Sequence, residues 1–306
     1  MKLIVLSDIH ATGKQPIGRS DNYILTCMAK LDYVYSFAKK QSAMILQTGD
    51  FVDKTRDWLM VALLMELLKK YKVQTYVIPG QHDMYFRNVE ENKVKSTTMG
   101  VLREAGLVTF LHQQVIRGVA LYGAGWKMDI PKKSLNEEEG DYRVLIIHSS
   151  ISMNKESHVS TTGAKAFAKK YKDRFDLIVC GDIHKSFKYT TGDTTILNTG
   201  SMLRKEATEY NYTHKPHFYI VNTRTRTIKK HIIPHADAEE VLLRDHLDRE
   251  TEIQSIMDDF MEAVESAPEE VKIDVLSNLY ELIKRTHVKK SVVKAIERIR
   301  YNAEQS

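Results

Sequence analysis

The sequence has only two cysteines, Cys27 and Cys180, among its 306 residues. A disulfide framework needs more cysteines, and the cysteines of a metal site usually stand in closely spaced pairs. We therefore expect both thiols to be reduced residues of the protein interior.

The chain also lacks the signals of a membrane protein or a secreted protein. Apolar runs such as Leu3 to Leu6 are far shorter than the ~20 residues that cross a bilayer, and the start of the chain has no small-residue cleavage site of the secretory kind. We expect a cytoplasmic protein without membrane spans. A glycine-rich phosphate loop, an internal repeat and a low-complexity tract are absent from the sequence as well.

The net charge of +5 conceals a strong asymmetry along the chain. Residues 1–235 carry 35 Lys and Arg against 23 Asp and Glu, a net charge of +12. Residues 236–282 have a net charge of −12, and residues 283–306 a net charge of +5. A basic body favours a polyanionic partner such as nucleic acid, although a solvated basic face has the same composition.

Short β-rich segments alternate with segments whose apolar residues recur at three and four positions, the period of an amphipathic helix. The strands predicted up to Cys180 are residues 2–6, 43–47, 74–78, 119–122, 143–147 and 177–179. The predicted helices are residues 23–40, 56–70 and 161–171. This alternation indicates a layered α/β fold.

The pattern changes after Cys180. Four further strands are predicted at residues 187–190, 194–197, 217–221 and 227–233, and we expect them to pair antiparallel. From Ala236 onward the strand signal disappears and apolar spacing becomes helical. We therefore predict two domains, residues 1–235 and a helical C-terminal region at residues 236–306.

Polar residues that can bind metal follow five of the predicted strands, where each strand ends. They are Asp8 and His10, Asp50 and Asp53, Gln81 to Asp83, His148, and Asp182 and His184. Because ligands of open α/β sheets bind beyond the carboxyl ends of the strands, we expect these groups to converge at one edge. Carboxylates, imidazoles and an amide oxygen together suit divalent metals of the Mn, Fe or Zn type.

These five motifs, in this order, resemble those of the calcineurin-like metallophosphoesterase superfamily, whose pattern is DxH, GDxxD, GNHD or GNHE, a single His after a strand, and GHxH. The resemblance covers about residues 1–235. It implies a layered β-sandwich flanked by helices, here with a C-terminal helical extension. It also implies hydrolysis of a phosphoester with the help of two divalent metal ions.

Carried over by position, the resemblance assigns each motif a role. Asp8, His10 and His184 would hold the first metal, Asp50 would bridge both metals, and Gln81, His148 and Asp182 would hold the second. His82 would be the catalytic residue, an imidazole beside the leaving oxygen. Asp53 and Asp83 would orient His82 or the loops, although turn carboxylates are an equal alternative. Arg56, Arg87 and Lys185 follow the metal motifs within a few residues, and from this position we expect them to contact the phosphates that flank the scissile one.

Two residues depart from the family pattern. Gln81 stands where the family has Asn, and Asp182 stands where the family has the first His of GHxH. Both remain competent ligands, and the added carboxylate favours Mn or Mg over Zn at the second site. A weakened or vacant second site is the alternative.

Within the superfamily, the segments Asn198 to Ser201 and Lys215 to Val221 resemble the turn and closing strand of the SbcD-type DNA repair nuclease branch. Thr199 replaces the proline of that turn. This likeness implies DNA as the substrate and a homodimer. It also implies that the helical region caps DNA or binds a coiled-coil ABC-type ATPase of the SbcC type. A phosphodiesterase or phosphatase for small esters and an inactive scaffold of the same fold are the alternatives.

Overall fold

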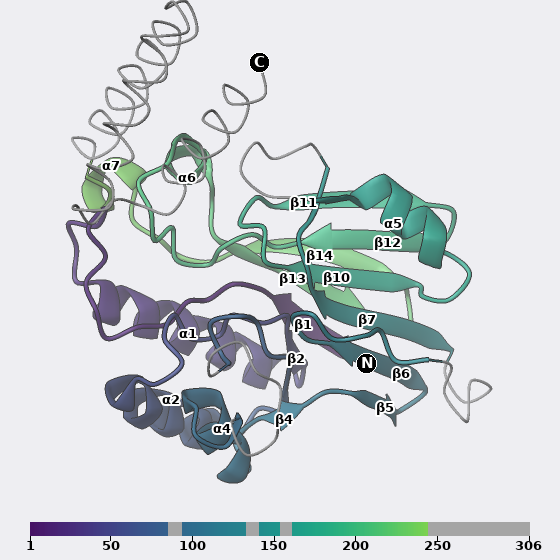
Figure 1. Ribbon diagram of the computed structural model, residues 1–306, viewed down its shortest axis with the longest axis horizontal. Coiled ribbons are helices and arrows are strands. Elements are labelled where there is room, and N and C mark those ends of the chain that lie inside the picture. The colour runs from purple at the N-terminus through teal and green to yellow at the C-terminus, as the bar shows by residue number, and fades with distance from the viewer. Residues whose placement is uncertain (85–93, 133–140, 154–160, 244–306) are drawn as a thin grey trace, which may run out of the picture. The chain divides into compact units, whose positions relative to one another are not determined.

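Two six-stranded β-sheets face each other in this computed structural model, and helices lie on their outer faces (Figure 1). The structure describes residues 1–84, 94–132, 141–153 and 161–243. The chain divides into two units, Met1–Arg244 and Asp245–Ser306. All features below belong to the first unit, and most of the predicted helical C-terminal region lies outside the described residues.

The first sheet contains the N-terminal strands of the chain. Its order is β14 (Thr227–Ile232), β13 (His217–Asn222), β1 (Lys2–Leu6), β2 (Met44–Gln47), β3 (Thr75–Val77) and β4 (Thr109–Phe110). Strands β1 to β4 run parallel, whereas β13 pairs antiparallel with both β1 and β14.

The second sheet contains the middle of the chain. Its order is β11 (Phe187–Thr191), β12 (Thr194–Asn198), β10 (Leu177–Gly181), β7 (Tyr142–His148), β6 (Val119–Ala124) and β5 (Gln113–Ile116). The four central strands are parallel and the two edge strands are antiparallel to their neighbours. A separate pair joins β8 (Ile151–Ser152) to β9 (Thr162–Gly163).

Alternating apolar side chains explain how the layers stack, because successive residues of a strand face opposite sides of a sheet. Leu3 and Val5 of β1 belong to the core between the sheets, whereas Ile4 and Leu6 pack with the helices outside the first sheet. These helices are α1 (Tyr23–Lys40), α2 (Trp58–Tyr71) and α4 (Thr98–Glu104). Helix α5 (Ala164–Tyr171) packs on the second sheet. The predicted layered α/β fold is confirmed.

Local signals set where the helices begin. The side chain of Asn22 accepts a hydrogen bond from the backbone N–H of Leu25 and begins α1, while Asp57 does the same for α2 through Met60. Helix α5 begins at Ala164, later than predicted, because residues 162–163 form strand β9. Two short helices, α6 (Glu209–Thr213) and α7 (Ala238–Val241), pack against each other through a small apolar cluster.

The expectation that all four strands after Cys180 pair antiparallel is wrong in one respect. Strand β12 pairs antiparallel with β11 but parallel with β10, and β13 and β14 join the other sheet beside β1. The cause is the tertiary arrangement: β12 lies between β11, its hairpin partner, and β10, which precedes both in the sequence. Residues 109–110, 113–116 and 151–152 form short strands that the sequence pattern does not predict.

No helix among the described residues is both long enough and apolar enough to span a bilayer.

Candidate metal centre

Five loops that carry the predicted ligands leave parallel strands at the same edge of the two sheets. Strands β1, β2 and β3 are parallel neighbours in the first sheet, and β7 and β10 are parallel neighbours in the second. Two hydrogen bonds join the loops across the sheets: the backbone N–H of Asp182 donates to Asp8 Oδ1 at 3.0 Å, and His148 Nδ1 donates to the carbonyl of Thr48 at 2.6 Å. The motifs therefore meet at one end of the core between the sheets, beyond the carboxyl ends of the parallel strands.

One group of possible ligands contains Asp8, His10 and His184, whose nearest nitrogen and oxygen atoms all lie within 4.8 Å of one another. The two imidazoles meet edge to face, with His10 Nε2 and His184 Nε2 3.0 Å apart. Both Asp8 and His10 are buried. This arrangement offers one carboxylate oxygen and two ring nitrogens to a single cation.

A second group contains Asp8, Asp50 and His148, again within 4.8 Å of one another. Asp50 Oδ2 lies 3.4 Å from His148 Nε2 and 3.8 Å from His10 Nε2, so this carboxylate lies between the two groups.

Gln81 and Asp182, the two departures from the family motif, extend the second group. Gln81 Oε1 lies 2.8 Å from His148 Nε2, and Gln81 Nε2 donates to Asp182 Oδ1 at 2.8 Å. Asp182 Oδ1 is 3.9 Å from His148 Nε2. The side chains of Gln81 and Asp182 thus reach the neighbourhood of His148 in spite of their altered identity.

The chemistry of the donors fits divalent cations. Asp50 Oδ2 is buried and accepts no hydrogen bond. Burying a carboxylate oxygen without a partner is costly, which a bound cation would relieve. In addition, Asp8, His10, Asp50 and Asp182 all adopt left-handed backbone conformations, with φ of 44°, 49°, 52° and 93°. Such strain concentrates at functional sites, where it aims side chains at a ligand.

The pKa values of these groups reflect burial and mutual charge. Burial raises the pKa of Asp8 to about 6. Burial also disfavours ionised Asp50, but the charge of His148, whose Nε2 lies 3.4 Å from Asp50 Oδ2, outweighs it and lowers the pKa of Asp50 to about 2. The same pairing raises the pKa of His148 to about 10, against the effect of burial. Burial lowers the pKa of His10 and His184, which favours the neutral imidazole that binds metal.

His82 lies at the rim of this cluster, with 38% of its side chain exposed. Its ring meets that of His10 edge to face at 4.8 Å, and its Nδ1 donates to the backbone carbonyl of Asp53 at 2.9 Å. His82 also forms a group of possible ligands with His10 and Asp50. The hydrogen bond at Nδ1 leaves Nε2 as the nitrogen that can exchange a proton.

The carboxylates of Asp53 and Asp83 have different surroundings. Asp53 Oδ1 is 3.4 Å from His10 Nδ1 and forms an ion pair with Lys205. Asp83 is buried and accepts hydrogen bonds from the backbone N–H groups of Phe51, Val52 and Gly80. Asp83 therefore ties the loops after β2 and β3 together, whereas Asp53 contacts the imidazole of a candidate ligand.

The three residues predicted to contact phosphates have different surroundings. The guanidinium of Arg56 donates to the carbonyl and hydroxyl of Ser96. Lys185 is exposed and directly follows His184. Arg87 lies outside the described residues.

Three residues near the cluster were missed by the sequence pattern. The hydroxyls of Ser7 and Ser150 donate to the carboxylates of Asp8 and Asp182. Their position within two residues of a motif was the available signal. Lys205 offered no local signal, because 152 residues separate it from Asp53 in the chain.

Gly49 permits the close approach of the loop after β2 to His148. A Cβ atom there would lie 2.3 Å from His148 Nδ1, and the residue has a φ of +95°. We expect Gly49→Ala to combine backbone strain of about 1–2 kcal/mol with overpacking of about 1–3 kcal/mol, and to lower the amount of bound metal by displacing His148. Urea unfolding and elemental analysis measure both effects.

Gly106→Ala is the matched control, because Gly106 also has a positive φ of +67° but open space around its Cβ position. This variant should lose only the strain contribution and retain its metal. Equal stability and equal metal content in the two variants would contradict the role given to Gly49.

Comparison with solved structures gives distant likenesses. A structure described as a novel archaeal phosphodiesterase is 12% identical, with a TM-score of 0.43, and the match covers 76% of this chain and all of the other. A hypothetical protein from Pyrococcus horikoshii is 12% identical, with a TM-score of 0.41 and coverage of 82% and 93%. Zinc-bound Vps29 from Entamoeba histolytica is 11% identical, with a TM-score of 0.38 and coverage of 76% and 98%.

No curated protein matches the sequence significantly. The model of the calcineurin-like phosphoesterase family matches residues 1–186, a span that contains all the candidate metal ligands and ends two residues after His184. On the strength of that match, which covers more than half of the sequence, the chain belongs to the calcineurin-like phosphoesterase family.

Proposed function

We propose that the protein is a metal-dependent nuclease that hydrolyses phosphodiester bonds in DNA. The observation that carries the proposal is the convergence of carboxylates, imidazoles and an amide from five loops around buried Asp50, whose Oδ2 lacks a hydrogen bond. Asp8, His10 and His184 would hold one cation, Gln81, His148 and Asp182 the other, and Asp50 both. The two cations would be Mn, or Mg as the alternative, since oxygen ligands predominate at the second site.

When bound, two divalent cations supply Lewis-acid stabilisation of the charge that develops on the reacting phosphate. The side chains of the protein orient the groups around it. Asp53 is close to His10 Nδ1, and a carboxylate in this position fixes the ring of a ligating histidine. His82, held at Nδ1 by the Asp53 carbonyl, gives the proton on Nε2 to the leaving oxygen.

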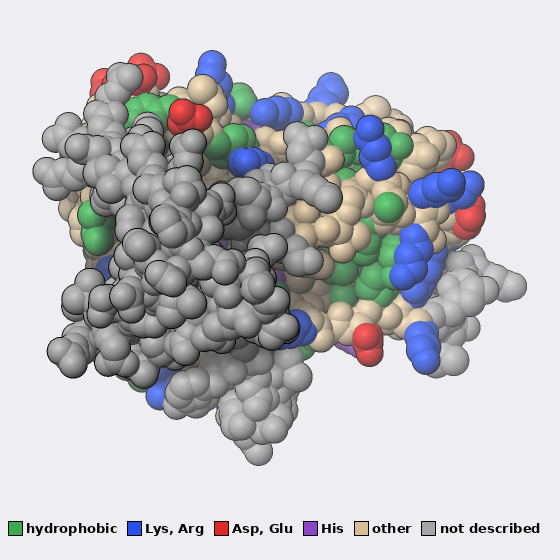
Figure 2. Space-filling model, turned by 45° about the horizontal axis from the view of Figure 1, so that its top comes forward, with side chains coloured by type: hydrophobic (Ala, Val, Ile, Leu, Met, Phe, Trp, Pro, Cys, Tyr) green, Lys and Arg blue, Asp and Glu red, His purple; other side chains and the backbone are tan. Residues whose placement is uncertain are grey.

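The charge of the body supports DNA over a small ester as the substrate. Residues 1–235 have a net charge of +12, and Lys and Arg side chains are spread over the described part of the face in Figure 2. The release of counterions increases the affinity of a polyanion for such a surface, whereas a small phosphoester has too few charges for this effect to be large.

The decisive experiment compares turnover of linear double-stranded DNA with turnover of a chromogenic phosphodiester, using protein loaded with Mn and protein stripped by a chelator. We expect the loaded protein to degrade DNA from its ends and to contain two metal ions per chain by elemental analysis. DNA binding should weaken by several orders of magnitude between 50 and 200 mM salt if about 6–10 phosphates are contacted.

Two outcomes would overturn the proposal. Turnover of the small ester without any on DNA would make the protein a small-molecule phosphodiesterase. Absence of both metal and turnover would make it an inactive scaffold, with Gln81 and Asp182 as the cause.

For the C-terminal region at residues 236–306, we propose binding to a coiled-coil ABC-type ATPase of the SbcC type, and we propose a homodimer for the whole protein. The net charge of −12 over residues 236–282 supports docking on a basic surface. Sedimentation of the full chain with and without such an ATPase tests both ideas, and a monomer that does not bind the ATPase would refute them.

A further inference from the structure

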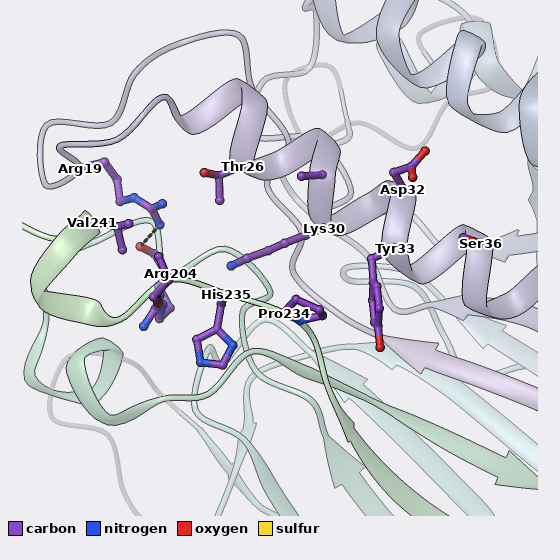
Figure 3. A pocket seen from close by; sticks show the side chains of 12 residues that line it. Arg19, Thr26, Lys30, Asp32, Tyr33, Ser36, Arg204, Pro234, His235 and Val241 are labelled. Carbon is purple, nitrogen blue, oxygen red and sulfur yellow. Dashed lines mark hydrogen bonds between the residues drawn. The ribbon is translucent and has the colours of Figure 1, made fainter.

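A pocket of about 670 Å³ lies beside α1, outside the cluster of candidate metal ligands (Figure 3). Its wall combines residues of α1 with the loop that contains Arg204 and the segment from Pro234 to Ala236, which follows β14. Figure 3 shows the Lys30 side chain extending from α1 towards His235 and Arg204. The volume lies in the range of sites for small molecules.

Three cationic side chains line this pocket, and all are buried: Arg19, Lys30 and Arg204 expose 3%, 4% and 3% of their surface. Each donates to a neutral backbone carbonyl. Arg19 Nη1 donates to Leu203 at 2.6 Å, Lys30 Nζ donates to Met202 at 3.0 Å, and Arg204 Nη2 donates to Ala236 at 2.6 Å. Carbonyls satisfy the N–H groups but do not neutralise the charges.

Among the described residues, the carboxylates nearest the pocket form ion pairs with Arg19 or with Lys70, and none with Lys30 or Arg204. Asp21 forms a two-pronged ion pair with Arg19, at 2.8 Å and 2.7 Å. Asp32 lines the pocket but is bound to Lys70 Nζ at 2.7 Å and to the hydroxyl of Tyr71 at 2.8 Å. Within the described part of the chain, no carboxylate forms an ion pair with Lys30 or Arg204. Asp21, Asp237 and Glu239 act on Arg204 only from a distance.

Two further features indicate a missing partner. Arg204 Nε is buried and has no hydrogen-bond acceptor. Burial and the neighbouring charges of Arg204 and Arg19 lower the pKa of Lys30 to about 7. An unpaired charge in the protein interior is expensive to keep, and an anion in the pocket would offset that cost.

The chemistry of the lining narrows the class of anion. A guanidinium and an ammonium on one cavity suit an oxyanion with several acceptor oxygens, as in a phosphate group. The volume exceeds that of a phosphate ion, and Ala29, Tyr33, Pro234 and Val241 add apolar surface beside the cations. We propose that this pocket binds the phosphate group of a small phosphorylated ligand of nucleotide size, through Lys30 and Arg204.

The pocket is distinct from the metal centre, but residues 201–205 have contacts with both. Lys205 Nζ forms its ion pair with Asp53, and the Ser201 hydroxyl donates to the carbonyl of Asp8 at 3.4 Å. The carbonyls of Met202 and Leu203, between these two residues, accept from Lys30 and Arg19. The loop therefore has contacts with both sites. The two sites share no lining side chain among the described residues, so phosphate binding in the pocket can be measured on protein without metal.

The experiment is titration calorimetry of the full chain with inorganic phosphate and with adenosine 5′-monophosphate. It is run on metal-loaded protein and again in the presence of a chelator, which removes phosphate binding that depends on the metals. We expect the wild type to bind both probes in the chelator, the nucleotide more tightly. Lys30→Met and Arg204→Gln should each weaken that binding at least tenfold.

Lys69→Met is the control, because Lys69 is an exposed lysine of α2 outside the pocket. It should bind both probes as the wild type does. Absence of binding in the chelator, or equal binding by wild type and Lys30→Met, would overturn the proposal. Because the chelator arm does not depend on catalysis, failure here leaves the nuclease proposal intact, and failure of the nuclease assay leaves this site intact.

Stability against pH shows whether Lys30→Met remains folded. Lys30 faces Arg19, Arg204 and His235, Asp32 lines the same pocket, and Cys27 and Asp21 act in the opposite sense. The pKa of Lys30, about 7 in the folded protein, is below the ordinary value of 10.5. Between these two values the unfolded chain binds the extra proton, so the wild type should gain stability relative to Lys30→Met as pH rises through this interval. Thermal unfolding of both proteins at pH 6, 8 and 10 measures the difference. A constant difference would show that Lys30 is not a desolvated cation and would overturn the site.

Discussion

We expect replacement of His82 by alanine to reduce turnover of DNA by about 10²–10⁴-fold, the usual contribution of a positioned proton donor. The residue contacts the cluster through two separate groups. Its backbone N–H donates to Asp50 Oδ1 at 2.9 Å, and its side chain donates to the Asp53 carbonyl at 2.9 Å. The substitution removes the side-chain contacts with Asp53 and His10 but keeps the backbone hydrogen bond to Asp50.

The measurement is initial rate at saturating substrate, together with the metal content of the same preparation by elemental analysis. A proton donor predicts a large loss of rate with unchanged metal content. A fall in metal content would instead make His82 a ligand, as its grouping with His10 and Asp50 allows. His112→Ala serves as the control, because His112 is exposed and far from the motifs in sequence.

Asp50→Asn should have the largest effect, because it removes the negative charge shared by three imidazoles. Asp50 Oδ2 is 3.4 Å from His148 and 3.8 Å from His10, and the carboxylate also affects His184. Loss of one partner from a buried charge pair costs about 3–5 kcal/mol, which corresponds to two to four orders of magnitude in a rate or an affinity. We expect the metal content to fall and the rate of DNA turnover to drop to the rate measured without enzyme.

The near-isosteric shape of asparagine keeps the acceptor for the His82 N–H, so the effect reports charge. Asp193→Asn is the control, since Asp193 is an exposed carboxylate in the turn between β11 and β12. Retention of two metals and of activity in Asp50→Asn would remove the basis for a bridging carboxylate and, with it, the two-metal mechanism.

Much of the fold could be predicted from local patterns. The succession of strand-like runs, such as Leu3 to Leu6, and helix-like segments is visible in the sequence, and it indicates a layered α/β fold. The five motifs could be placed at strand ends because the polar residues directly follow apolar runs. Both signals depend on residues close together in the chain.

These local signals do not show which strands pair with each other. Strand β12 looks like any half of a hairpin, yet it pairs parallel with β10 on its other side. A strand offers hydrogen bonds along both edges, and which neighbours take them depends on the packing of the whole sheet. The same holds for strand β13, which crosses to the first sheet and pairs with β1.

The sequence by itself determined the chemical types that the chain can present at its strand ends, the alternation of its layers and the charge of its body. Only the tertiary structure decided which side chains become neighbours: Lys205 beside Asp53, and Lys30 beside Arg204 in a buried pocket. The physical reason is distance along the chain. Burial and unbalanced charge belong to groups that folding brings together, and no local pattern records residues separated by more than a hundred positions.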